Sequence, residues 1–64
     1  MTQHQLDLVE AARAELLSLG TNPDGRRLHG WHRRHRRVLV RAGMGDLEVF
    51  HLLFQLERVV YPLF

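Results

Sequence analysis

Hydrophobic residues recur with the period of an α-helix in three stretches of the chain. The spacing predicts helices over about residues 3–19, 23–42 and 46–61, joined by short turns. Strong helix formers, Ala and Leu, fill much of the first stretch, and glycines separate the stretches from one another. We therefore predict an all-α fold, a small three-helix bundle that forms one domain over residues 1–64.

Residues that start and stop helices mark the predicted boundaries. Thr2 is a candidate N-cap of the first helix, and Gly20 suits the left-handed position that follows its end. The second helix has two possible starts: Asn22 as the cap with Pro23 in the first turn, or Asp24 as the cap of a later start.

The third stretch is apolar over more of its circumference than one packing face requires. Asp46 is its expected N-cap, and Pro62 ends it. One stripe consists of Leu47, Phe50, Phe54 and Tyr61, and the other of Val49, Leu52, Leu56, Val59 and Leu63. Since so short a chain can hardly cover both stripes, we predict a homo-oligomer, with a dimer favoured. The predicted oligomer interface comprises Val49, Phe50, Leu52, Leu53, Leu56, Val59, Val60, Leu63 and Phe64.

Composition supports the same expectation. The chain has 64 residues and no cysteine, so disulfides and thiolate metal sites are excluded. Oligomerisation is then the expected supplement to a small core. The sequence has neither an apolar run of membrane-spanning length nor a signal-peptide pattern, and we expect a cytoplasmic protein.

Positive charge is concentrated in the middle of the chain. Formal net charge is +2, and all nine basic residues are arginines. Seven of them fall within the second predicted helix, whose inward face is expected to carry Leu28, Trp31, His35, Val38, Leu39 and Ala42. The outward face carries Arg26, Arg33, Arg37 and Arg41, flanked by Arg27, Arg34 and Arg36.

Like charges at helical spacing repel each other, and an anionic partner would relieve the repulsion. Nucleic-acid phosphates are a common partner of this kind, so these seven arginines are the predicted nucleic-acid-binding residues. An acidic protein surface is a second possibility, and a third is pairing with acids of the first helix such as Glu10 and Glu15. Because Trp31 is expected to point inward, the arginine face lacks aromatic residues for base stacking, which favours duplex over single-strand contact.

The sequence does not favour metal binding or catalysis. His29, His32 and His35 spiral around the second helix among arginines, so we predict no metal site. Glu57 interrupts an apolar stripe of the third helix, and Arg13 is its expected partner. No nucleophile, phosphate-binding loop or paired carboxylates stand in a recognisable motif, so we predict neither an enzyme nor a cofactor.

These observations together predict a small, basic, oligomeric protein that binds nucleic acid, with regulatory contact to the DNA backbone preferred. The alternative is a protein–protein interaction module that binds a larger partner through its apolar third helix.

Overall fold

The computed structural model describes residues 1–62, which form three helices joined by turns. Helix α1 spans Gln3–Ser18, α2 spans Gly25–Arg41 and α3 spans Asp46–Val60. The all-α prediction is confirmed, and each predicted boundary lies within two residues of the observed one. Leu63 and Phe64, both part of the predicted interface, lie outside the described residues.

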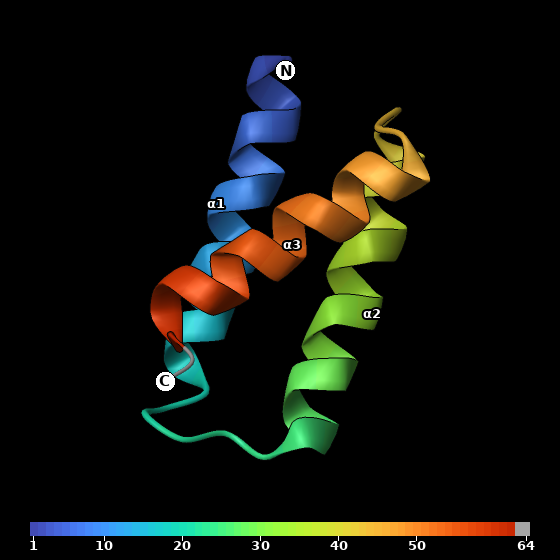
Figure 1. The fold of residues 1–64 in the computed structure, drawn as a ribbon. Helices are drawn as coiled ribbons and strands as arrows, with labels where there is room; N and C mark the ends of the chain where they lie inside the picture. The colour runs from blue at the N-terminus through green and yellow to red at the C-terminus, as the bar shows by residue number, and fades with distance from the viewer. Residues whose placement is uncertain (63–64) are drawn as a thin grey trace.

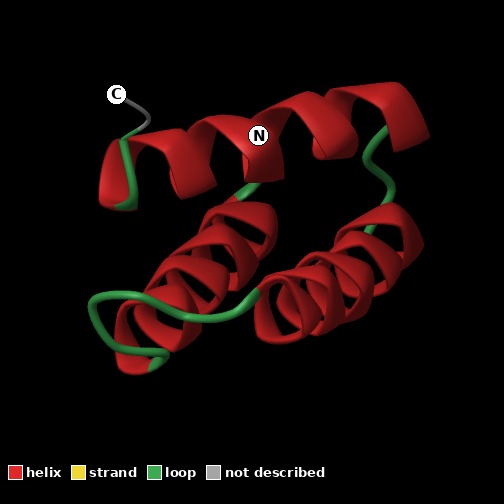
Figure 2. Cartoon of the chain, turned by 60° about the horizontal axis from the view of Figure 1, so that its bottom comes forward, coloured by secondary structure: helices red, strands yellow, loops and turns green. Residues whose placement is uncertain are grey.

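Helices α1 and α2 stand side by side and run in opposite directions, and α3 lies across both of them (Figure 1). In the turned view, α3 forms a second layer on top of the α1–α2 pair (Figure 2). All three pairs of helices are in contact. This arrangement buries one side of α3 and leaves α2 with a long outer surface.

Trp31 lies at the centre of the core. Its side chain is fully buried, and its indole Nε1 donates a hydrogen bond to the carbonyl oxygen of Ala12 in α1 at 2.8 Å. A buried indole N–H usually has such a partner, because leaving it unpaired is costly. The predicted inward orientation of Trp31 is therefore confirmed. The other buried core residues are Ala12, Leu16, Leu39, Met44, Val49 and Leu53.

A single glutamine connects the start of α1 to the end of α2. The Thr2 hydroxyl accepts from the Gln5 backbone N–H, and the Gln5 side-chain oxygen accepts from the Thr2 backbone N–H. These two bonds form a capping box, so the predicted Thr2 cap is confirmed. The Gln5 Nε2 also donates to the carbonyl of Ala42 at 2.9 Å, which satisfies one acceptor at the end of α2.

The start of α2 agrees with one of its two predicted alternatives, whereas the start of α3 differs from the prediction. Asp24 caps α2 by accepting from the backbone N–H of Arg27 at 2.8 Å, so the later of the two proposed starts is the observed one. The predicted Asp46 cap is wrong. Gly45 occupies the N-cap of α3, and Asp46 is the first helical residue, where its carboxylate binds Arg36 instead.

The two apolar stripes of α3 have different environments. Val49 and Leu53 are fully buried within the chain, and Leu52, Leu56 and Val60 are half-buried against its core. The crossing of α3 over both neighbours therefore uses much of the predicted oligomer interface internally. Among the described hydrophobic residues of α3, the exposed ones are Leu47, Phe50, Phe54 and Val59.

Tyr61 joins the end of α3 to the end of α1. Its hydroxyl lies within hydrogen-bonding distance of the carbonyl oxygens of Leu16 and Gly20. Gly20 has a φ of 96°, the left-handed conformation expected after a helix end. The apolar stripe that includes Tyr61 thus carries a hydroxyl whose one hydrogen can be donated to a carbonyl acceptor at the end of α1.

Candidate nucleic-acid interface

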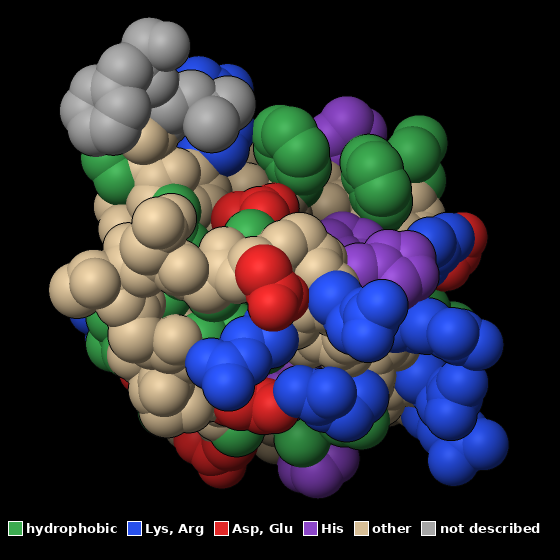
Figure 3. All heavy atoms as spheres, turned by 90° about the horizontal axis from the view of Figure 1, so that it is seen from below, with side chains coloured by type: hydrophobic (Ala, Val, Ile, Leu, Met, Phe, Trp, Pro, Cys, Tyr) green, Lys and Arg blue, Asp and Glu red, His purple; other side chains and the backbone are tan. Residues whose placement is uncertain are grey.

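The predicted outward arginines of α2 are exposed. Arg26, Arg33, Arg37 and Arg41 all lie in the exposed class, as does the flanking Arg27. Figure 3 shows arginine side chains gathered on one side of the molecule. The second helix thus presents most of its charge to solvent.

Two flanking arginines have internal partners. Arg34 forms an ion pair with Glu15 of α1. Arg36 makes a two-pronged contact with Asp46, with Nε to Oδ1 at 2.8 Å and Nη2 to Oδ2 at 2.6 Å. The hydrogen bond from Arg36 lowers the pKa of Asp46 below its ordinary value. These pairs explain how the fold tolerates the densest part of the arginine run.

Gly30 makes room for one of these contacts. A Cβ at this position would lie 3.3 Å from Nη1 of Arg34, because the guanidinium folds back across the glycine toward Glu15. The glycine weakens the helix by about 1 kcal/mol relative to alanine. It also separates Arg26 and Arg27 from the arginines of the next turns.

Arg26, Arg27, Arg33, Arg37 and Arg41 form what we call the arginine face. Within residues 1–62, none of these five side chains lies within ion-pair distance of a carboxylate. Three of them line a shallow groove of about 410 Å³ together with Arg36, Val40 and Asp46. Guanidinium groups presented in this way can form bidentate contacts with phosphate oxygens.

Glu15 holds two side chains of α2 at once. Its carboxylate contacts both Arg34 and His35. The hydrogen bond with His35 is the largest cause of a lowered pKa for Glu15, and Arg34 adds to it. Of the acids in α1 considered as partners of the arginine run, Glu15 is the one that is engaged. Glu10 instead lies 4.0 Å from Arg13.

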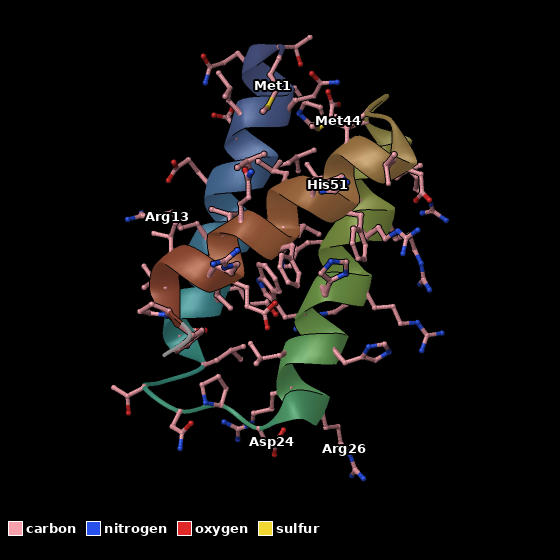
Figure 4. The ribbon with its side chains drawn as sticks, in the orientation of Figure 1. Met1, Arg13, Asp24, Arg26, Met44 and His51 are labelled. Atoms are coloured by element: carbon pink, nitrogen blue, oxygen red, sulfur yellow. The ribbon has the colours of Figure 1, made fainter. Side chains whose placement is uncertain are left out.

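The predicted pairing of Arg13 with Glu57 is wrong. Arg13 lies on an exposed side of α1, with 52% of its side chain accessible, and Figure 4 shows it pointing away from α2. Glu57 lines a groove between α2 and α3 together with His29 and His32. Glu57 faces α2 because of the way α3 crosses it. The helical wheel of α3 alone does not show which neighbouring helix a residue faces.

His32 has a half-buried ring with an unusual environment. Its Nε2 atom is buried and has no hydrogen-bond partner, and its ring stands edge-on to Phe50 at 5.4 Å between centroids. Burial and the nearby Arg36 lower the pKa of His32, which favours the neutral form of the ring. Within the described part of the chain, no three potential metal-ligating side chains come together.

Two phenylalanines of α3 lie beside the arginine face. The sequence predicts Phe50 only as an oligomer-interface residue and predicts no site role for Phe54. Phe50 and Phe54 are 40% and 45% exposed, and their rings are nearly parallel, with 14° between planes. The guanidinium carbon of Arg36 lies 5.8 Å from the Phe50 ring centroid. The outward face of α2 itself carries no aromatic ring, since Trp31 is buried, but α3 places Phe50 and Phe54 next to Arg36 at its edge.

The helices of residues 1–62 include none that is long and apolar enough to cross a membrane. The chain matches no protein-family model, no curated protein and no solved structure.

Proposed function

We propose that this protein binds nucleic acid by placing phosphate groups against the arginine face of α2. The observation that carries the proposal is the set of five exposed arginines that have no carboxylate partner within residues 1–62. Two neighbouring arginines are neutralised by Glu15 and Asp46, so these acids leave the arginine face available. A cytoplasmic, regulatory role is part of this proposal.

The energetic basis is mutual repulsion that a polyanion relieves. Like charges one helical turn apart destabilise a helix by about 0.2–0.5 kcal/mol per pair. Arg33, Arg37 and Arg41 stand at that spacing. Phosphates replace this repulsion with attraction and release counterions from the nucleic acid, which supplies most of the affinity in sequence-independent binding.

We also propose that the chain self-associates through α3, with a dimer favoured. Val59 is 78% exposed, and the half-buried Leu52 and Leu56 precede it at helical spacing, so an apolar strip remains on this side of the helix. A second copy would cover the strip and double the number of arginines presented to one nucleic acid. Sedimentation equilibrium tests this part: a monomer at micromolar concentration would contradict it.

Charge reversal on the arginine face tests the proposed function. The double substitution Arg33→Glu with Arg37→Glu should reduce retention of labelled DNA in a gel-shift assay by at least about tenfold, because it replaces phosphate contacts with repulsion. Both side chains are exposed, so the helical circular dichroism spectrum and thermal midpoint should change little.

Arg13→Glu is the matched control, since it reverses an exposed arginine on α1 outside the arginine face. This variant should bind DNA nearly as well as the original protein. Equal retention by the double variant and the original protein at low salt would rule out the arginine face as the binding site.

The second candidate function is a protein–protein interaction module. The exposed row of Leu47, Phe50 and Phe54 on α3 favours it, because contiguous exposed apolar side chains often mark interfaces. This candidate would be supported if the protein does not bind DNA, and if it sediments as a monomer that tends to aggregate over time.

A further inference from the structure

A groove between α2 and α3 places exposed aromatic rings beside the arginine face. It has a volume of about 410 Å³, and Phe50 and Phe54 form one wall. Leu28 and His29 of α2 lie across from them. Figure 3 shows hydrophobic side chains in the upper part of the molecule directly beside histidine and arginine side chains.

The groove and the arginine face form one continuous surface. Arg36 lines both this groove and the shallower one that contains Arg33, Arg37 and Arg41. Its guanidinium carbon also lies over the Phe50 ring, 5.8 Å from the ring centroid. A strand whose phosphates follow the arginines would therefore pass within reach of the phenylalanine rings.

The two rings are suited to stacking. Their centroids are 6.3 Å apart, and their planes differ by 14°, so they present nearly parallel surfaces. His32 supports Phe50 from the α2 side through an edge-on contact at 5.4 Å. Rings that are fixed in orientation lose little freedom when a base stacks on them.

We infer that the protein prefers single-stranded nucleic acid, with unpaired bases stacking on Phe50 and Phe54 while the phosphates contact the arginine face. This inference rests on the proposed function and names its substrate class. Paired bases in a duplex have their faces covered by neighbouring pairs, whereas every unpaired base offers a free face to an aromatic side chain.

Charge favours a polyanion over a second copy on these rings. In a two-fold symmetric interface each residue patch meets the same patch of the other copy. Pairing through Phe50 and Phe54 would therefore bring two arginine faces together. The strip of Leu52, Leu56 and Val59 on another side of α3 remains for self-association.

Two carboxylates lie near the expected path of the strand. Asp46 is held by Arg36, so its charge is largely compensated. Glu57 lines the aromatic groove and has no ion-pair partner within residues 1–62. Glu57 should therefore weaken binding of a single strand, and its removal provides a test that a folding defect cannot imitate.

The experiment compares three fluorescein-labelled probes by anisotropy: a thymidine oligonucleotide of about 12 nucleotides, an abasic strand of equal length, and a duplex of equal length. The thymidine strand should bind about tenfold more tightly than the abasic strand, because both carry the same phosphates and one lacks bases to stack. It should also bind more tightly than the duplex.

Phe50→Leu and Phe54→Leu should each lower affinity for the thymidine strand by about tenfold and leave the duplex and abasic affinities nearly unchanged. Leu17→Ala is the matched control, since it removes apolar surface from an exposed position of α1 outside both the groove and the self-association strip. Glu57→Gln should raise affinity for the thymidine strand about two- to threefold, because it removes a negative charge close to the bound phosphates.

The outcomes separate the two proposals. If all probes bind equally and the phenylalanine variants have no effect, the single-strand inference is overturned while the proposed function stands. If no probe binds at low salt, both are overturned. If either phenylalanine variant lowers the mass of the protein in solution, a second copy covers the rings and the inference is overturned.

Discussion

Individual side chains decide which charges of this molecule are available to a partner. Arg34 and Arg36 lie in the same helix as Arg33 and Arg37, but contacts from α1 and from the start of α3 engage the first two. A helical wheel cannot distinguish these pairs, because the carboxylates come from other elements. The distinction between engaged and available arginines is therefore a property of the fold.

His32 makes the stability of the fold depend on pH. Its pKa is lowered in the folded state, so the unfolded chain binds the proton more readily near the ordinary value of 6.5. Its contribution to stability is fully present above that pH and is lost as pH falls through the folded-state pKa. The charged and titratable groups that influence it are Arg36 and His29 of α2 and Glu57 of α3.

We predict that the urea midpoint falls as pH is lowered from about 7.5 to 5.5, and that His32→Leu weakens this dependence by removing the group that must be held neutral. Glu15 and Asp46 also have lowered pKa values, but their contributions are lost at lower pH, around and below the ordinary carboxyl range. An equally steep dependence in the variant would contradict the role given to His32.

At the scale of the helices, the sequence predicts features that depend on neighbouring residues, such as caps, but it does not predict contacts between helices. Thr2 and Gly20 act as predicted, since capping and left-handed glycine depend on neighbouring residues. The Gln5 contact with Ala42 spans 37 positions, so no local pattern reports it. Asp46 satisfies the residue preference for a cap but binds Arg36 instead, because the fold brings a guanidinium group within reach.

Gln5 provides a test of how helix ends are joined. Gln5→Glu keeps an oxygen that can accept from the Thr2 backbone but loses the N–H₂ donor to Ala42. It should reduce the free energy of unfolding by about 1–2 kcal/mol, because a carboxylate then faces a carbonyl oxygen.

Gln55→Glu is the control for the added charge, since Gln55 is exposed on α3. Its midpoint in urea denaturation should change little. If the two variants have the same stability, the contact between Gln5 and α2 contributes nothing measurable.

At the scale of the whole molecule, the sequence predicted the fold class and the outward direction of the arginine face. It overestimated how much of α3 a second copy would need to cover, because Val49 and Leu53 are buried by α1 and α2. It also missed the contact of Arg36 with Phe50, which brings the two phenylalanines beside the arginine face and depends on how α3 crosses α2. Self-association and nucleic-acid binding both remain predictions.

The most direct test of the arginine face is the salt dependence of affinity for DNA. Engagement of four or five arginines predicts that log K falls with log salt concentration with a slope of about −3 to −3.5 on single strands and about −3.5 to −4.5 on duplex DNA for each bound chain. Arg37→Gln should reduce the magnitude of that slope by about 1, whereas Arg13→Gln should leave it unchanged. A slope near zero, or a slope that responds equally to both substitutions, would contradict the account.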